Sequence, residues 1–209
     1  MITVIGSSNT DFVVRAKRFP RPGETVLGCD FLMAKGGKGA NQAVQVAKLG
    51  HKVAFVANIG KDRLGDEAVK EFKRLGIDTS FIVRDLLYAS GSALIILSKA
   101  GENRIVVAPG SNAHLRPSHV RRARKLIEKS DVVLLQLEIP LDTVREAVEI
   151  AHRAGVCIIL NSAPAKKLPD KVLSNVDILV PNEVEFECLC GASMGIYHRR
   201  TRGSSRTLL

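Results

Sequence analysis

The sequence lacks tryptophan, has only two tyrosines, and contains no continuous apolar stretch long enough to cross a membrane. A membrane-spanning helix needs about 20 consecutive apolar residues, so we expect no transmembrane segment. The first six residues have no positively charged region before an apolar stretch, which argues against a secretory signal and predicts a buried strand. We therefore expect this chain of 209 residues to be a soluble, cytoplasmic, globular protein.

Cysteine is also scarce, and its spacing does not match a zinc site. Cys188 and Cys190 are close together, but the nearest histidine, His198, lies in a basic tail without apolar periodicity. A chain of this length does not need disulfides for stability. We interpret these two cysteines, with Cys29 and Cys157, as free and partly buried thiols.

Acidic residues are missing from the last eleven positions, where four arginines contribute to a net charge of +10. A second basic cluster, Arg121 to Lys125, lies within a predicted helix. These clusters raise the alternative of nucleic-acid binding, which salt-dependent binding to DNA would test. Aromatic residues make up only 4% of the chain, which leaves few rings for stacking on bases. We favour a solvated helix face and expect neither a nucleic acid nor a membrane as a partner.

Short β-branched segments alternate with longer helical patterns along the chain, which predicts an α/β fold with a mostly parallel sheet flanked by helices. Gly50, Gly76 and Gly155 each follow a predicted helix, at the position where a left-handed residue often ends one. The expected strands are residues 2–5, 53–57, 132–135, 156–160 and 178–180, and the expected helices are residues 38–49, 64–75, 117–129, 141–154 and 169–173.

Two pairs of strand-like segments interrupt this alternation. Residues 12–17 and 25–33 are joined by a Pro-Arg-Pro-Gly turn, and residues 92–97 and 104–108 flank a turn around Gly101. Neither pair has a crossover helix between its strands, so each should pair antiparallel. We predict a small antiparallel β lid, formed by residues 12–34 and 92–108, that projects from the main domain.

A glycine-rich segment, Gly36-Gly37-Lys38-Gly39-Ala40-Asn41-Gln42, precedes an apolar helix. It matches neither the phosphate-binding P-loop nor the dinucleotide fingerprint. Its glycines allow either a close approach of the backbone to a ligand or a tight loop that serves packing alone. Asn41 carries both a hydrogen-bond donor and an acceptor, which suits a sugar hydroxyl.

Polar residues follow several predicted strands: Asn9 and Asp11, then Glu138, Asn161, and finally Asn182 with Glu185. Ligands of open α/β sheets bind beyond the carboxyl ends of the strands. Asp11 alone could equally be a turn residue. Together, these residues favour a site for a polar small molecule.

The glycine-rich segment resembles the N-terminal signature of the ribokinase-like, or PfkB, carbohydrate kinases. Other similar segments occur in the family's order across residues 2 to about 191. They are Gly6-Ser7-Ser8-Asn9-Thr10-Asp11, Pro22-Gly23-Glu24-Thr25, Gln136-Leu137-Glu138, Asn161-Ser162-Ala163-Pro164-Ala165 and Pro181-Asn182-Glu183-Val184-Glu185.

The resemblance implies a kinase that transfers phosphate from ATP to D-ribose, forming ribose 5-phosphate, with Mg²⁺. It implies that Asn182 and Glu185 help to place magnesium and phosphate, Glu185 through an indirect contact with the metal. It also implies a lid that closes over the sugar and mediates a homodimer. The residues that would bind the sugar are Asn9, Asp11, Gly37, Lys38, Asn41 and Glu138.

The sequence departs from the family pattern at Ser162, where proline is usual, and at Val184, where a small polar residue is common. The Gly-Ala-Gly-Asp motif that supplies the family's catalytic base and anion hole does not occur, so we assign no catalytic residue. The family's adenine pocket and monovalent-cation site are missing as well.

We interpret residues 1–190 as an incomplete domain of this family and residues 191–209 as a disordered or frameshifted tail. The chain is then a truncated kinase, inactive by itself and poorly soluble because one side of its sheet is uncovered. Two alternatives stay open. One is a non-catalytic module that binds sugar or dimerises through the lid, and the other is a related kinase acting on fructose or a nucleoside.

Overall fold

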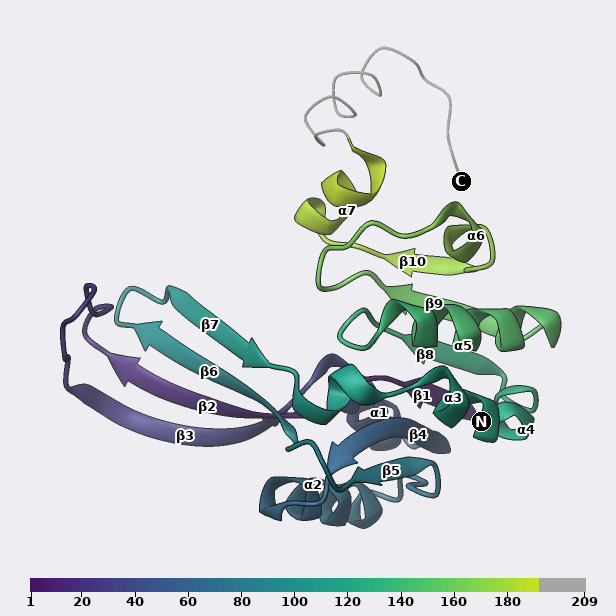
Figure 1. Ribbon diagram of the computed structural model, residues 1–209, viewed down its shortest axis with the longest axis horizontal. Helices are drawn as coiled ribbons and strands as arrows, with labels where there is room; N and C mark the ends of the chain where they lie inside the picture. The colour runs from purple at the N-terminus through teal and green to yellow at the C-terminus, as the bar shows by residue number, and fades with distance from the viewer. Residues whose placement is uncertain (192–209) are drawn as a thin grey trace.

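The computed structural model describes residues 1–191, in which a helix-covered sheet carries a projecting lid (Figure 1). The main sheet has six strands, all parallel, which confirms the α/β class. Its carboxyl ends therefore share one edge. In sheet order the strands are β10 (Ile178–Val180), β9 (Cys157–Asn161), β8 (Val132–Leu135), β1 (Ile2–Ile5), β4 (Val53–Gly60) and β5 (Ile82–Asp85).

The inner strands of this sheet are buried because alternate side chains point into two hydrophobic cores. Val4 and Phe55 belong to one core, which helices α1 and α2 complete. Their neighbours Ile5 and Val56 belong to the other, which α3 to α6 complete. The helices are α1 (Lys38–Lys48), α2 (Arg63–Arg74), α3 (Pro117–Arg122), α4 (Arg124–Ile127), α5 (Leu141–Arg153), α6 (Asp170–Leu173) and α7 (Glu183–Cys190), with a 3₁₀ helix, η1 (Gly110–His114).

Most predicted elements are confirmed to within a few residues, and the three glycines expected at helix ends all have positive φ. The helix predicted over residues 117–129 is wrong as a single element, because Ala123 leaves helical geometry and separates α3 from α4. The strand predicted over residues 53–57 continues to Gly60. The sequence did not predict β5, η1 or α7, which are short or lack a clear apolar period.

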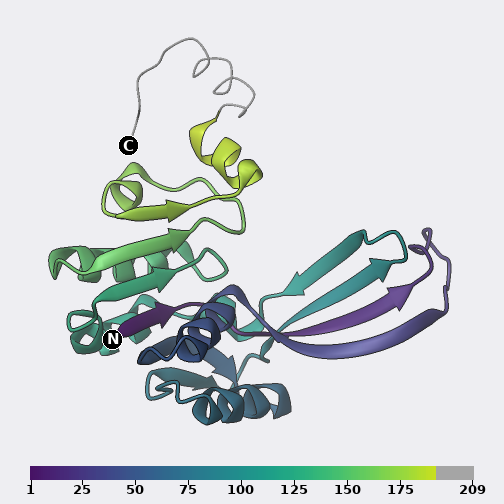
Figure 2. The same ribbon diagram turned by 180° about the vertical axis from the view of Figure 1, so that it is seen from behind.

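The lid is a separate sheet of four strands that extends away from the main sheet (Figures 1 and 2). Its two hairpins are antiparallel, as predicted. The lid as a whole is a mixed sheet and not purely antiparallel, because β2 and β6, from the two different hairpins, pair in parallel at its centre. Both strands leave the main domain in the same direction, so the hairpins lie side by side. In sheet order the strands are β3 (Gly28–Gly36), β2 (Asn9–Ala16), β6 (Gly91–Ser98) and β7 (Asn103–Ala108).

Three further expectations from the sequence concern membrane spans, the cysteines and the basic cluster. None of the helices within residues 1–191 has the length and apolar character of a membrane span. All four cysteines are free, but Cys29 and Cys190 are exposed, which corrects the prediction of partly buried thiols at those positions. The basic side chains from Arg121 to Lys125 are exposed, as expected of a solvated face, and Arg121 pairs with Glu146 at 2.9 Å. His198 and most of the predicted tail lie outside the described residues.

Candidate functional site

Three segments meet where the lid joins the main sheet: the turn from β1 to β2, the start of α1, and the end of β8. The Glu138 carboxylate joins all three. Its Oε2 accepts a hydrogen bond from the Ser7 hydroxyl at 2.5 Å and another from the backbone N–H of Lys38 at 2.9 Å. The Ser7 hydroxyl also accepts the N–H of Gly39 at 3.3 Å. The first turn of α1 is therefore held against both β1 and β8.

The glycines of the signature permit this close contact. Gly37 has φ of +90°, and a Cβ there would lie 2.7 Å from the backbone N of Asn9. A Cβ on Gly39 would lie 2.6 Å from the backbone N of Ser7. Backbone atoms cannot move aside as a flexible side chain can. Close packing of the chain on itself thus accounts for both glycines, and it also directs the Lys38 N–H at Glu138.

Asp11 lies on β2, half-buried and close to Glu138. Burial raises the pKa of its carboxyl group, and the negative charge of Glu138 raises it further. Its carboxylate rests against Gly36, where any Cβ would collide with it. The Asp11 carboxylate has no hydrogen-bond partner among residues 1–191, so its oxygens are available to a ligand.

Asn9 begins β2 and is 7% exposed. Its side-chain oxygen accepts a hydrogen bond at 2.7 Å from Asn112, a residue of η1 that the sequence analysis did not single out. Asn112 follows Pro109 and Gly110 in what reads as an ordinary turn, and its partners are more than 100 residues away. No local signal in the sequence identifies it.

Asn41 and Asn161 differ from Asn9 in their hydrogen bonds. Asn41 lies in the first turn of α1 with an exposed side chain that makes no hydrogen bond within the described part of the chain. Asn161 ends β9, and its side-chain oxygen accepts the N–H of Ala163 at 2.8 Å. Asn41 is available to a ligand, whereas Asn161 shapes its own loop.

Asn182 and Glu185 cap the N-terminus of α7. The Asn182 side chain accepts the N–H of Glu185 at 2.8 Å, and Glu185 Oε2 accepts the N–H of Asn182 at 3.0 Å. Glu185 Oε1 accepts the Asn182 amide at 2.9 Å, and the Ser162 hydroxyl donates to Oε2 at 3.2 Å. Ser162, one of the two departures from the family pattern, therefore supports the same carboxylate.

This cap lies apart from the cluster around Glu138. Strand β10, which precedes α7, is two positions in the sheet from β8, which precedes Glu138, or about 10 Å at the usual spacing between strands. No group of three or more potential metal ligands occurs within residues 1–191. Mg²⁺ usually keeps several waters and binds one or two carboxylates with substrate phosphates. Both oxygens of Glu185 already accept hydrogen bonds, so Glu185 fits such an ion through an intervening water.

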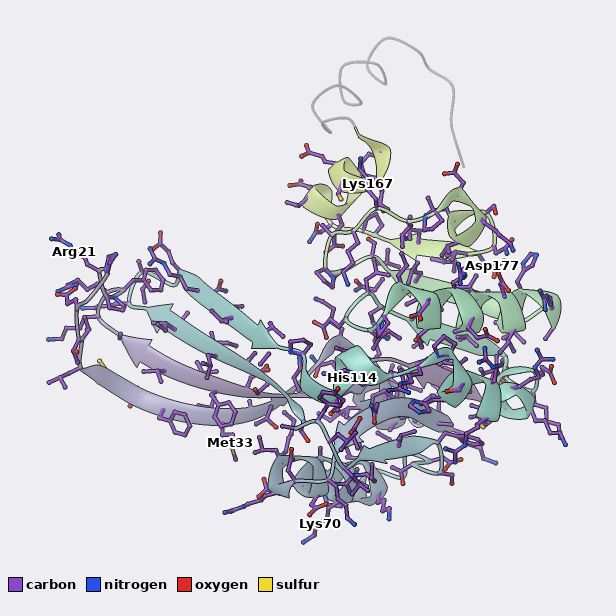
Figure 3. All side chains as sticks on the ribbon, in the orientation of Figure 1. Arg21, Met33, Lys70, His114, Lys167 and Asp177 are labelled. Carbon is purple, nitrogen blue, oxygen red and sulfur yellow. The ribbon has the colours of Figure 1, made fainter. Side chains whose placement is uncertain are left out.

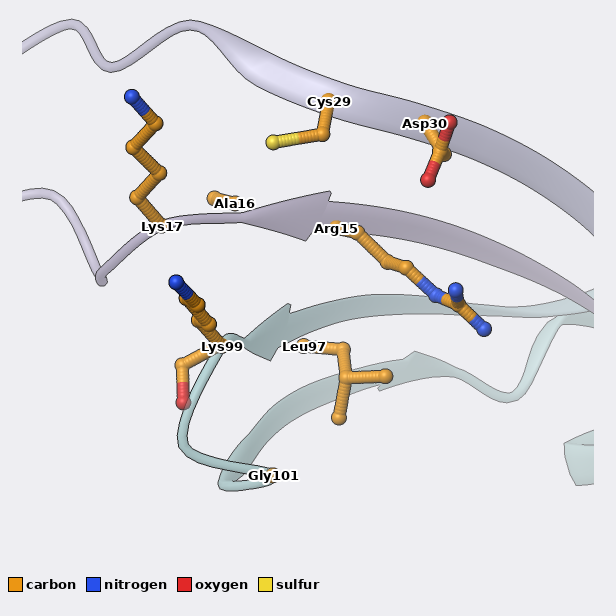
Figure 4. A pocket seen from close by; sticks show the side chains of 9 residues that line it. Arg15, Ala16, Lys17, Cys29, Asp30, Leu97, Lys99 and Gly101 are labelled. Carbon is orange, nitrogen blue, oxygen red and sulfur yellow. The ribbon is translucent and has the colours of Figure 1, made fainter.

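Other features lie away from this edge. A hollow at the outer end of the lid is lined by Arg15, Lys17, Cys29, Asp30 and Lys99, among others (Figure 4). It contains none of the residues predicted to bind the sugar. His114, in η1, lies where the lid joins the main domain and not at the outer end of the lid (Figure 3).

Comparison with known proteins agrees with this arrangement. The ribokinase of Haemophilus influenzae is 46% identical over 193 residues, which are 92% of this chain and 63% of that protein. The deoxyribokinase of Salmonella typhi is 35% identical over 209 residues, covering 100% of this chain and 68% of its own length. A structure of Arabidopsis thaliana ribokinase complexed with ribose and ATP has a TM-score of 0.86 at 29% identity, covering 96% of this chain and 66% of that one.

This chain thus spans about 63% of the length of the Haemophilus ribokinase. The family model described as pfkB family carbohydrate kinase matches residues 1–199. That match includes both sheets, the glycine-rich start of α1 and the α7 cap. The chain belongs to the pfkB family of carbohydrate kinases.

Proposed function

We propose that this chain binds D-ribose at the edge where the lid joins the main sheet. Asp11 and Asn9 offer an acceptor and a donor on neighbouring positions of one face of β2. A sugar hydroxyl both donates and accepts, so a pair of this kind can bind adjacent hydroxyls. The observation that carries the proposal is the half-buried, unpartnered carboxylate of Asp11 beside Glu138.

In this proposal Glu138 organises the site. By accepting the Ser7 hydroxyl and the Lys38 N–H, it holds the glycine-rich turn in place. Gly37 keeps the turn close to Asn9, and Asn41 and the Lys38 side chain complete the sugar contacts from the first turn of α1. The lid closes over the sugar and excludes water, which protects ATP from hydrolysis.

The chemistry of the family suggests transfer of the ATP γ-phosphoryl group to the primary hydroxyl of ribose. Asn182 and Glu185 would orient the Mg²⁺-bound phosphates from the start of α7, Glu185 through a water. When bound, Mg²⁺ neutralises charge on the phosphates. The 209-residue polypeptide contains no Gly-Ala-Gly-Asp segment to supply the base. We therefore propose that by itself it binds the sugar without transferring phosphate.

The 35% identity to a deoxyribokinase over the full chain favours 2-deoxy-D-ribose as a second candidate sugar. Fructose and nucleosides are further alternatives within the family. We also propose that the lid mediates a homodimer, since it exposes several large apolar side chains. These include Phe31, Leu32, Leu94, Ile105 and Val106.

Calorimetric titration of the purified chain with D-ribose, 2-deoxy-D-ribose, D-fructose and adenosine tests the sugar. We expect D-ribose to bind most tightly and Asp11→Asn to weaken that binding at least tenfold. A chain that binds none of the four would refute the sugar site. A coupled assay for ADP, with Mg²⁺, ATP and ribose, tests the second half of the proposal. Ribose-dependent ADP above a mock preparation would refute the absence of turnover.

A further inference from the structure

Asn112 lies where the chain passes from the main sheet into the lid. It is 2% exposed and belongs to η1, which follows the last lid strand. Its side-chain amide forms hydrogen bonds with both backbone polar groups of Ser8, the residue directly before β2. The Ser8 N–H donates to Asn112 Oδ1 at 2.9 Å, and Asn112 Nδ2 donates to the Ser8 carbonyl at 3.1 Å.

These contacts determine which end of each amide is oxygen. The Ser8 N–H can only donate, so the Asn112 atom facing it must be the carbonyl oxygen. The other end of that amide is then the NH₂ group, and its second proton points to Asn9 at 2.7 Å. The Asn9 atom that receives it must therefore be an oxygen. The Ser8 N–H therefore fixes the orientation of the Asn112 amide, and the Asn112 amide fixes that of the Asn9 amide.

We propose that Asn112 is a positioning residue that makes Asn9 present its NH₂ group, and not its oxygen, to the ligand. The Asn9 NH₂ has no partner within residues 1–191. Asn9 and Asp11 are two residues apart on β2, so they lie on the same face of the lid. The site thus combines a fixed donor at Asn9 with an acceptor at Asp11. It selects a ligand that places a hydrogen-bond acceptor, such as a hydroxyl oxygen, against the Asn9 NH₂. The ligand part of this inference rests on the proposed function.

The pair of amides packs closely against Gly91 on one side. A Cβ on Gly91, at the start of β6, would collide with both Asn112 Nδ2 and Asn9 Oδ1. Gly91 does not have positive φ, so space and not backbone conformation requires glycine there. Gly91→Ala should therefore separate the two amides, and its Cβ would also lie 3.0 Å from the Pro109 carbonyl oxygen.

Side-chain amide hydrogen exchange, followed by ¹⁵N NMR, tests the orientation without any ligand. In the wild-type chain we expect the NH₂ group of Asn112 to exchange at least tenfold more slowly than that of Asn9. In Gly91→Ala the Asn112 protons should lose protection. In Asn112→Asp at pH 8 the ionised carboxylate only accepts, so Asn9 should turn and its NH₂ become protected. Equal exchange of the two wild-type NH₂ groups, or an Asn9 NH₂ that stays unprotected in Asn112→Asp, would overturn the proposal.

Titration with D-ribose tests the consequence for binding. Asn112→Asp should lower the affinity about tenfold, as expected when an acceptor faces an acceptor. In an Asn9→Ala background the same substitution should change affinity less than twofold, because Asn112 acts through Asn9. Ser111→Ala is the matched control. It removes a neighbouring buried hydrogen bond to the Asn58 carbonyl and should leave affinity within twofold.

Equal losses in both backgrounds, or an equal loss in Ser111→Ala, would mean that Asn112 only supports the fold, and the proposal would fail. If the wild-type chain does not bind D-ribose, the proposed function fails instead. The exchange measurement then still decides the orientation of the amides.

Discussion

Asp62 connects α2 to the lid, and its removal should destabilise the protein more than the loss of a neighbouring surface ion pair. Its Oδ1 accepts the N–H of Gly65 at 2.8 Å, which caps the start of α2. The same carboxylate accepts the N–H of Ser90 at 2.6 Å and the Ser90 hydroxyl at 2.8 Å, directly before lid strand β6. One side chain therefore accepts hydrogen bonds both from the first turn of α2 and from the residue that precedes the lid strand.

We expect Asp62→Ala to lower the free energy of unfolding by about 3 kcal/mol. Loss of a helix cap costs about 0.5 to 2 kcal/mol, and a hydrogen bond to a charged group contributes about 1.5 to 3 kcal/mol. For a chain of this length each kcal/mol lowers the melting temperature by about 2 to 4 °C. The variant should therefore melt about 6 to 12 °C below the wild type.

The stability that Asp62→Ala loses relative to the wild type should also depend on pH. Burial alone would raise the pKa of Asp62, but the hydrogen bonds from Ser90 and Gly65, with the charge of Arg84, outweigh burial and hold this pKa below its ordinary value. A carboxyl group with a lowered native pKa stabilises the fold above its unfolded pKa of about 3.9. That stabilisation is lost as the pH falls through the native pKa. The difference between wild type and Asp62→Ala should be full at pH 7 and shrink below about pH 4.

Urea denaturation followed by far-UV circular dichroism, at pH 7 and in steps down to pH 3, measures this difference. Asp66→Ala is the matched control, since Asp66 lies on the same helix and pairs with Arg84 at 2.6 Å. Its side chain is 67% exposed, and exposed ion pairs contribute about 0 to 1 kcal/mol. A loss in Asp62→Ala no larger than in Asp66→Ala, or one independent of pH, would refute the reasoning.

Two further predictions concern the site and the core. Asp11→Asn should weaken D-ribose binding without lowering the melting temperature, because burial and the charge of Glu138 make the ionised carboxyl group unfavourable in the fold. Since these effects raise its native pKa, the wild type should gain stability relative to Asp11→Asn and lose sugar affinity as the pH falls through that pKa, which calorimetry and thermal melts at matched pH would measure. Phe72→Ala should cost about 3 to 5 kcal/mol, because its fully buried ring meets Phe55 edge-on, whereas Phe31→Ala, on the exposed lid, should cost far less in the same urea assay. Equal costs for these two phenylalanines would contradict the assignment of the core.

The glycine-rich turn shows what a local sequence pattern predicts and what it leaves open. The sequence analysis left its glycines open between ligand binding and close packing. The backbone atoms of Ser7 and Asn9 that exclude a Cβ from Gly39 and Gly37 come from a segment about 30 residues earlier, so packing accounts for these glycines. The binding roles of Gly37, Lys38 and Asn41 stay predictions. Asn182 and Glu185 were predicted from their position after a strand and from the family motif, and their capping of α7 became visible only with the helix itself.

The sequence by itself determined the α/β class, most helix and strand positions, the two lid hairpins and the family. These follow from apolar periodicity, turn residues and motifs, all of which are local in the chain. Tertiary structure alone decided the parallel pairing of β2 with β6, the break at Ala123 and the pairing of Asn112 with Asn9. The last of these joins residues 103 positions apart. Such contacts depend on how whole elements pack, and a hydrogen bond between distant side chains leaves no periodic trace in the sequence.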